Sequence, residues 1–414
     1  MRFLAVGFMD ALAGKRTKPI EREREGERMA RVLITADLVP TDTNFHLFED
    51  GLLNDLAGEE LAGILQEADF IAMNLETPLC DQPSPIEKCG PCLCAPTKTV
   101  KGIKKINPYF FTLANNHVMD QGEAGLYSTL NALESEGIAT AGAGKNLEEA
   151  SKPFIANVDG IRIGFYCCAE HEFSIATENV PGANPYDPLC SFEQVADVKR
   201  QCDYVVVLYH GGLEHYRYPS PKLQKVFRKF VDAGADLVVA QHTHCIGCEE
   251  KYHGSTLVYG QGNFLFDHSS LEEWKTALVI SLDLGKEKTG ISYLPIVKRG
   301  NGVRMAGEKE KTEILTQFEK RSRDIEKPGF IEDAFEGLAR EMEKEYLLRL
   351  YGKKSKSPLV RLLDKLTDYQ YVKSLYPTKN KSVVRNVLEC EAHNELAIAV
   401  MNLNKKGGRE SNGK

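Results

Sequence analysis

Short runs of apolar residues recur along the first 240 residues, without the polar alternation expected of a strand exposed on one face. They are RVLITA (31–36), ADFIAM (68–73), YFFTLA (109–114), DYVVVLY (203–209) and ADLVVA (235–240). Each run is short and rich in β-branched or aromatic side chains. This pattern predicts strands that are covered on both faces.

Between these runs the apolar positions change to a helical spacing. The segments AGLYSTLNALESEGI (124–138) and KLQKVFRKFVDAGAD (222–236) each place an apolar stripe on one face, and the second stops at Gly234. The stripes consist of Leu126, Leu130 and Leu133 in the first segment, and of Leu223, Phe227 and Phe230 in the second. Strands that alternate with helices predict an α/β fold.

Polar side chains follow the apolar runs at the points where the predicted strands end. They are Asp37, Glu76 in NLE, Asn115, Asn116 and His117 in NNH, His210, and His242 and His244 in QHTH. In α/β sheets, ligands bind beyond the carboxyl ends of the strands. We therefore expect these side chains to gather at one edge, with Asn115 as an ordinary turn residue.

The composition and the apolar pattern of the sequence change after about residue 300. The segments that begin at Glu308, Phe335 and Ser382 are charged and amphipathic, and they predict helices. We expect a disordered or artefactual extension over 1–28, a main domain over 29–300, a small helical C-terminal region over 301–404 and a disordered tail over 405–414.

Composition limits the classes of protein to which the chain can belong. Apolar residues make up 42% and charged residues 27% of the 414 residues, as in ordinary soluble globular proteins. A net charge of -7 disfavours a nucleic-acid binder, which usually has a basic face. No window approaches the roughly 18 uncharged apolar residues of a membrane-spanning helix.

The N-terminus and the cysteines favour a cytoplasmic protein. The first 14 residues resemble a weak signal peptide, but Asp10 interrupts the apolar run and EREREGE follows, so Met29 is the expected start. Eleven cysteines, an odd number that includes adjacent Cys167 and Cys168, form a poor disulfide framework.

The histidines at the strand ends are candidate metal ligands. On an extended segment that leaves a strand, the side chains of His242 and His244 point the same way and can serve two neighbouring metals. Taken alone, such a pair more often consists of surface or core histidines. His210 precedes two glycines, which let a substrate or another backbone segment approach closely.

The oxygen donors complete a set suited to two cations. Asp37 is a hard ligand, although by itself it suits a turn or a helix cap. Glu76 can bridge two ions with its two oxygens, although Glu is usually exposed. Asn116 offers a carbonyl oxygen, which would leave His117 to face the substrate. One Asp, one Glu, one Asn and three His are a set of the size that two divalent cations require.

Seven ordered motifs carry a family resemblance over roughly residues 30 to 300. They are ADLVP, NLETPL, ANNHVMDQGEAGL, GAGKNLEEA, HGGLEHY, GADLVVAQHTH and VYGQGNFLFD. This order resembles the CapA, or poly-γ-glutamate capsule synthesis, branch of the calcineurin-like metallophosphoesterase superfamily. The resemblance implies a four-layer α/β/β/α fold, in which two sheets pack together with helices outside.

The resemblance also implies roles for individual residues around two divalent ions (Mn, Zn or Fe). Asp37 and His244 would bind the first metal, Glu76 would bridge, and the second metal would be held by Asn116, His210 and His242. His117 would donate a proton to the leaving group. One departure concerns Val39, which stands where the wider superfamily has a histidine, so the first site has three protein ligands.

The functional expectation is a CapA-like, metal-dependent hydrolase that acts on a phosphate-containing or polyanionic substrate, with a capsule-synthesis ligase as a candidate partner. A non-catalytic assembly or polymer-binding component is the alternative, and a plain sugar- or nucleotide-phosphate phosphatase is the third. The missing histidine at position 39 leaves the first two open.

Several other motifs are interpreted as structural. Cys80, Cys89, Cys92 and Cys94 lie within fifteen residues, but Cys-x-x-Cys-x-Cys is not the usual pair of pairs that binds zinc. Cys245 and Cys248 have a redox spacing but do not open a helix. The remaining candidates are His171, Glu214 and His215, which either line the pocket or are polar loop residues, and His393, which is left out of the site.

Overall fold

The structure is a computed structural model that describes residues 29–88, 90–285, 288–350, 358–367, 370–374, 378–389 and 393. The predicted extension at 1–28 and the predicted tail at 405–414 lie outside these residues. The chain divides into two compact units, Met1–Ile331 and Glu332–Lys414. The first unit thus runs beyond residue 300, where the main domain was expected to end.

The first of two large sheets has eight strands among the described residues. Its order is β16 (Gly302–Met305), β15 (Thr289–Arg299), β14 (Thr276–Leu284), β1 (Ala30–Val39), β2 (Phe70–Leu75), β3 (Phe110–Thr112) and β4 (Ala139–Ala141), and β13 (Asn263–Phe266) also pairs with β1. Strands β1 to β4 run parallel, whereas β14 to β16 are joined in antiparallel pairs. The parallel half contributes the strand ends with polar residues.

The second large sheet has six strands among the described residues. Its order is β11 (Glu249–Tyr252), β12 (Ser255–Val258), β10 (Leu237–Gln241), β9 (Tyr204–His210), β7 (Ile161–Ala169) and β6 (Phe154–Val158). Strands β12, β10, β9 and β7 are parallel. A small separate ladder joins β5 (Ala143–Gly144) and β8 (Gly182–Ala183).

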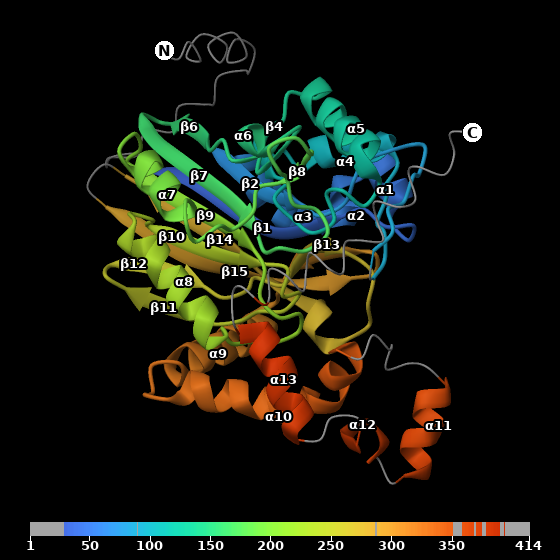
Figure 1. Ribbon diagram of the computed structural model, residues 1–414. Helices are drawn as coiled ribbons and strands as arrows, with labels where there is room; N and C mark the ends of the chain where they lie inside the picture. Colours follow the sequence, from blue (N-terminus) through green and yellow to red (C-terminus); the bar gives the residue numbers. More distant parts are fainter. Residues whose placement is uncertain are drawn as a thin grey trace. The chain divides into compact units, whose positions relative to one another are not determined.

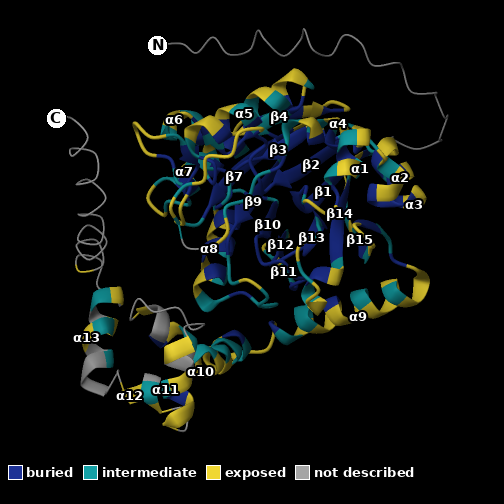
Figure 2. Cartoon of the chain, turned by 90° about the vertical axis from the view of Figure 1, so that its right-hand side faces the viewer, coloured by how far each residue is buried: buried dark blue, intermediate teal, exposed yellow. Residues whose placement is uncertain are grey.

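Two apolar clusters show how the layers pack. On β9, Val206 and Leu208 belong to the core shared by both sheets, whereas Val205 and Val207 belong to a cluster on the opposite face. Because successive side chains of a strand point to opposite faces, β9 is covered on both. In Figure 2 the central strands, such as β9 and β10, are drawn almost entirely in the dark blue of buried residues. This confirms the prediction of strands that are covered on both faces.

Helices cover the outer faces of the two sheets (Figure 1). Apolar residues of α1 (Phe45–Asp50), α3 (Glu59–Glu67), α4 (Val100–Lys105) and α5 (Gly122–Ser135) join the core of the first sheet. Helices α7 (Ser191–Lys199) and α8 (Pro221–Asp232) pack on the second. Short elements complete this unit: α2 (Leu53–Ala57), α6 (Leu147–Ala150), η1 (Thr97–Thr99) and η2 (Glu272–Lys275). The four-layer α/β/β/α fold is confirmed.

Helix α8 shows why the predicted helical segments form. Its amino end is capped by Ser220, whose Oγ accepts a hydrogen bond from the Leu223 backbone N–H at 3.1 Å, and Pro221 occupies the first turn. Leu223, Phe227 and Phe230 are buried as the spacing predicts. The helix ends before Gly234, whose φ of +110° suits glycine.

The C-terminal segments are helical, as predicted, where the structure describes them. Helix α9 (Glu308–Asp324) belongs to the first unit, where Phe318 packs on Ile246 and Leu278. The others are α10 (Phe330–Leu350), α11 (Pro358–Leu366), α12 (Tyr371–Ser374) and α13 (Thr378–Glu389). Within the second unit, Lys381 on α13 donates to Glu343 on α10 at 2.5 Å. No helix in the described parts of the chain has the length and apolarity to cross a membrane.

Candidate metal centre

Five strands deliver polar side chains to one region, but they come from two sheets and not from one. Strands β1, β2 and β3 belong to the first sheet, and β9 and β10 belong to the second. All six predicted ligands are at most 8% exposed, a degree of burial that is rare for such polar groups. Their gathering at the carboxyl ends of the strands follows from the parallel direction of both sheet centres.

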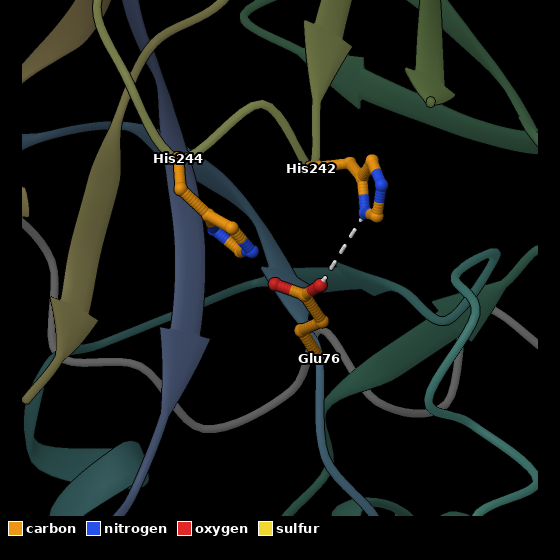
Figure 3. Close-up of side chains that lie close together, drawn as sticks. All are labelled: Glu76, His242 and His244. Carbon is orange, nitrogen blue, oxygen red and sulfur yellow. Dashed lines mark ion pairs between the residues drawn. The ribbon is translucent and has the colours of Figure 1, made fainter. Parts of the chain in front are cut away.

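Glu76 lies at the middle of this region. It comes directly after β2, and both its carboxylate and the rings of His242 and His244 are buried. One ligand atom from each of these three residues lies within 4.8 Å of the others. Figure 3 shows the carboxylate directed at the two imidazoles, with the Nδ1 of His242 lying 3.9 Å from Oε1.

Two further predicted ligands adjoin the same carboxylate. His210 is the last residue of β9, and its Nε2 lies 3.3 Å from Glu76 Oε1 and 3.0 Å from Asn116 Oδ1. Ligands 2.0 to 2.2 Å from a tetrahedral metal lie about 3.3 to 3.6 Å apart. The 3.3 Å separation between His210 and Glu76 therefore suits donors that share one cation.

Asp37 does not follow a strand, as the sequence suggested, but lies within β1. The extra length of β1 arises because Asp37 and Leu38 pair with both β2 and β13 and Val39 pairs with β13, with register shifts on either side of Asp37. Its Oδ1 accepts a hydrogen bond from Asn74 at 2.8 Å, and its Oδ2 lies 3.7 Å from His244 Nδ1. The irregular pairing thus occurs where Asp37 approaches His244, and such irregularities commonly redirect a side chain.

The His242–His244 segment is not extended, which corrects the sequence interpretation. Both histidines have left-handed backbone angles, with φ of 87° and 52°. Such angles are uncommon for residues other than glycine, and they cluster at functional sites. The backbone N–H of His242 donates to Asp37 Oδ2 at 3.1 Å, which helps to hold this conformation. The two rings still approach one another, with centroids 5.8 Å apart.

Several buried polar atoms of this region lack hydrogen bonds among the described residues. They are both carboxylate oxygens of Glu76 and Nδ1 of His242. A buried polar group without a partner costs about 1 to 3 kcal/mol, so such groups need a reason. A divalent cation bound by these atoms supplies that reason, and the mixed oxygen and nitrogen donors fit Mn²⁺, Fe²⁺ or Zn²⁺.

Burial and neighbouring charges shift the pKa values of several groups in this region. Burial raises the pKa of Asp37 well above its usual range, and the charge of Glu76 acts in the same direction. Burial also disfavours ionised Glu76, but the surrounding imidazoles, first His210, outweigh it and hold its pKa well below the usual range. Burial lowers the pKa of His210 to about 4. A bound cation would favour ionised carboxylates and neutral imidazoles, the forms that bind metals.

His117 lies beside the ligands with a different set of partners. Its Nδ1 lies 2.6 Å from Asp120 Oδ2 and 3.2 Å from Lys88 Nζ, which also pairs with Asp120. Its side chain is 12% exposed, compared with 0% for Glu76. The Nδ1 contacts leave Nε2 on the opposite side of the ring. This arrangement suits a residue that contacts a bound substrate better than a residue that binds a metal ion.

Sequence reasoning missed four residues that orient these side chains. Asn74 contacts Asp37 and lies 3.3 Å from His210 Nδ1, and Asn263 Oδ1 lies 2.8 Å from His244 Nδ1. Asp120 and Lys88 contact His117 as described above. Asn74 and Asn263 lie in the quoted motifs NLETPL and VYGQGNFLFD, so a search for partners of the histidines within those motifs could have found them.

Asn115 does more than form a turn. Its Nδ2 donates to Asn74 Oδ1 at 3.1 Å and to the Leu75 carbonyl at 2.8 Å, and its Oδ1 accepts from the backbone N–H of His117. These bonds tie the segment after β3 to the end of β2. Asn115 therefore fixes the position from which Asn116 and His117 project.

The other polar candidates differ in their surroundings. His215 accepts a hydrogen bond from Trp274 Nε1 at 2.8 Å, and its ring centroid lies 6.2 Å from that of His244. Glu214 and His171 are exposed. Val39, at the position where the resemblance implied a missing histidine, is 1% exposed and pairs with Phe266 of β13.

The cysteines behave as reduced residues in the described part of the chain. Cys80, Cys92 and Cys94 are free, with Cys80 Sγ lying 2.8 Å from Cys94 Sγ, and Cys89 lies outside the described residues. Cys245 and Cys248 are fully buried. No metal-binding cluster of cysteines is found within the residues that the structure describes.

Burial predicts that Cys245 is chemically inert. It raises the pKa of the Cys245 thiol to about 11 and moves that of Cys248 in the same direction. Because the thiolate is the reactive form, alkylation of Cys245 by iodoacetamide near neutral pH should be about 100-fold slower than that of half-buried Cys92. Mass spectrometry of timed reactions measures both rates. Fast labelling of Cys245 in the folded protein, as opposed to urea-unfolded protein, would contradict this interpretation.

The fold and the site together define an α/β protein of two packed sheets, with a buried carboxylate and histidine cluster at the strand ends. A model of the family described as bacterial capsule synthesis protein PGA_cap matches residues 53–268. The chain belongs to this family, which confirms the CapA resemblance noted in the sequence.

Named relatives extend this finding. The PGA biosynthesis protein CapA of Bacillus subtilis is 32% identical over 232 residues, which cover 55% of this chain and 60% of that protein. The capsule biosynthesis protein CapA of Bacillus anthracis is 28% identical over 287 residues, 67% of this chain and 69% of that protein. A solved structure described as a novel phosphatase from Mycoplasma pneumoniae has a TM-score of 0.40 and 13% identity, covering 69% of this chain and 97% of that one. The structural similarity is too low to bear on activity.

Proposed function

We propose that the chain is a metal-dependent hydrolase of the phosphoesterase type that takes part in the synthesis of poly-γ-glutamate capsule or a related polymer. The link to capsule synthesis is supported by the family and by the names of the Bacillus relatives. The hydrolase activity is supported by the site. A phosphate-containing or polyanionic substrate fits both, and a capsule-synthesis ligase is the proposed partner.

One observation carries the proposal most directly. Glu76, His242 and His244 come from two different sheets, are buried, and bring their ligand atoms within 4.8 Å of one another, while both Glu76 oxygens make no hydrogen bond among the described residues. A carboxylate held this way without a cation would be costly. We infer that Glu76 bridges two divalent ions.

The residues around Glu76 would then divide between the two ions. Asp37 and His244 would hold one ion, and Asn116, His210 and His242 would hold the other. Such ions supply Lewis acidity and lower the pKa of bound water from 15.7 to about 7.

The chain's own groups would do the remaining work. Asn74 and Asn263 hold the rings of His210 and His244 in place, as outer partners of metal ligands do. Asp120 orients His117 through Nδ1, so that Nε2 can carry a proton toward the leaving oxygen of a substrate. The burial of the ligands excludes water from the carboxylate and strengthens its interactions with cations.

The test is a metal count combined with an ester assay. Purified protein is assayed with aryl phosphate monoesters and diesters in the presence of Mn²⁺, Zn²⁺ or Mg²⁺, and His242→Ala is compared with wild type. We expect activity and bound metal to be lost together in the variant. Activity that persists at wild-type level in metal-free protein would contradict the proposal.

A second candidate function is favoured by Val39. An apolar side chain at this position leaves the first ion with three protein ligands, which suits a non-catalytic metal-containing component that binds polymer or partners. Two bound ions with no turnover of any ester, and polymer binding unchanged in His117→Ala, would favour this alternative over the hydrolase.

Asn263 gives a prediction that holds for both candidates. Asn263→Ala removes the acceptor for His244 Nδ1, so the ring should lose its fixed orientation. Loss of such an outer partner weakens metal affinity about 10- to 100-fold. Competition with a fluorescent chelator measures the affinity, and Asn54→Ala, at an exposed position of helix α2, is the control. Unchanged affinity in Asn263→Ala would refute this role.

A further inference from the structure

A cavity of about 790 Å³ lies in the first unit. Some of the residues that line it lie close in sequence to residues of the candidate metal centre. The lining of the cavity includes Ile246, which follows His244 by two residues, and Arg217, which follows His215 by two residues. Helix α9 closes another side through Glu313 and Arg321. The loops that carry the histidines thus continue directly into the wall of this cavity.

Most of the charges around the cavity are already paired. Lys275 pairs with Glu272 at 2.7 Å, and Lys298 pairs with Asp267. Glu310 accepts two hydrogen bonds from Arg304, at 2.7 and 2.8 Å. The charged residues that line the cavity and have no ion pair among the described residues are Arg217, Arg321 and Glu313.

The two arginines contact only neutral acceptors in the described part of the chain. Arg217 donates through one terminal nitrogen to the Ile246 carbonyl at 3.1 Å, and Arg321 donates through Nε to the Gly247 carbonyl at 2.7 Å. A guanidinium has five N–H donors, so each side chain retains most of its capacity. Consecutive carbonyls hold the two groups side by side.

Glu313 is badly placed to neutralise this pair. It precedes Arg321 by eight residues on the same helix, and a rise of 1.5 Å per residue separates their backbones by about 12 Å along the axis. Burial lowers the pKa of Arg321, and the charge of Arg217 lowers it further. Two like charges held near one another in partial burial are costly, and a bound anion would offset that cost.

We propose that Arg217 and Arg321 form an oxyanion-binding subsite, which takes a carboxylate or phosphate group of a ligand in the cavity beside the metal centre. The planar fork of a guanidinium matches both kinds of oxyanion. The assignment of this group to the substrate of the centre rests on the proposed function, whereas anion binding by the two arginines does not.

The geometry also indicates how this subsite connects to the centre. Both carbonyls that the arginines hold belong to the segment that continues from His242 and His244. Helix α9 is anchored to that region, because the Ser322 hydroxyl accepts a hydrogen bond from the Glu249 backbone N–H at 2.8 Å. The segment that the arginines contact is therefore continuous with the segment that carries His242 and His244.

The test measures binding to the full-length protein as purified, by isothermal titration calorimetry at low ionic strength. The probes are inorganic phosphate and a γ-linked glutamate trimer. Trp274, the single tryptophan, precedes the cavity residue Lys275 and offers a second signal through its fluorescence. We expect saturable binding, with Kd raised about tenfold or more in Arg217→Gln and in Arg321→Gln, since each loses charged hydrogen bonds.

Three further variants keep the result interpretable. Arg323→Gln, an exposed arginine on the same helix, should bind as wild type does. Arg321→Lys keeps the charge without the fork, so a Kd between those of wild type and Arg321→Gln is expected even if the glutamine variant folds poorly. His242→Ala should lose metal but keep probe binding, which separates this subsite from the metal centre.

Each outcome decides the proposal. Binding of the trimer alone identifies a carboxylate site, binding of phosphate alone identifies a phosphate site, and binding of both supports the shared chemistry. The absence of saturable binding of either probe would overturn the subsite. Unchanged Kd in Arg217→Gln and Arg321→Lys, together with loss of binding in His242→Ala, would place the anion on the metals and would also overturn it.

Discussion

Glu76→Gln should remove bound metal from both positions and abolish most ester hydrolysis, the largest effect expected of any single substitution. Glutamine has nearly the same shape, but it has one oxygen acceptor and no charge, so it cannot bridge two cations. Loss of an electrostatic group at a reaction centre commonly costs 10²- to 10³-fold, and loss of a bridging ligand should cost on the order of 10³-fold or more. Elemental analysis and an aryl phosphate assay measure the two effects.

A matched control separates this effect from a general change of stability. Glu134→Gln makes the same chemical change at an exposed position of α5 and should leave metal content and turnover as in wild type. Thermal unfolding of both variants shows whether each retains the fold. If Glu76→Gln kept two ions per chain, the bridging role of Glu76 would be wrong.

His117→Ala should reduce turnover about 10²- to 10⁴-fold while leaving the metal content unchanged, because His117 is assigned to proton transfer and not to a metal. The size of the loss should depend on the substrate. An aryl leaving group departs easily without a proton, whereas an alkyl oxygen needs one. The loss in kcat should therefore be greater for an alkyl phosphate than for p-nitrophenyl phosphate.

This dependence on the leaving group distinguishes a proton donor from a structural residue. A structural defect would lower turnover of both substrates by the same factor. His46→Ala, an exposed histidine on α1, is the control and should retain activity on both. Equal losses on the two substrates, or a loss of metal from His117→Ala, would contradict the assigned role.

The sequence was sufficient to predict five of the strands, β1, β2, β3, β9 and β10, and to propose the candidate ligands. Runs such as DYVVVLY and ADLVVA form β9 and β10. A short segment that is apolar at every position avoids water only when both faces of the strand are buried. His210 and Glu76 could be predicted as site residues because ligands of α/β proteins bind beyond the carboxyl ends of such strands. Both residues lie at those ends in the structure.

Other features depend on contacts that a linear pattern does not encode. Asp37 lies inside β1 because β13, more than 220 residues later in the chain, pairs with the end of that strand. The left-handed conformation of His242 and His244 likewise depends on packing and on the hydrogen bond to Asp37. Apolar spacing carries no information on either.

Lys88 shows the same limit more clearly. It lies in the cysteine-rich loop, which suggested only thiol chemistry, yet its side chain is 2% exposed and contacts Asp120 and His117. A lysine buried against a carboxylate in this way depends on the path of a long loop between β2 and β3. Only the tertiary structure shows that Lys88 lies beside His117.

The most direct test of the central claim is a crystal structure of the protein grown with MnCl₂, with data collected to locate manganese by its anomalous scattering. If Glu76 bridges two ions, two peaks should lie on either side of its carboxylate, one shared with Asp37 and His244 and the other with Asn116, His210 and His242. A map with no peak within bonding distance of Glu76, at manganese concentrations that saturate any other site, would contradict it.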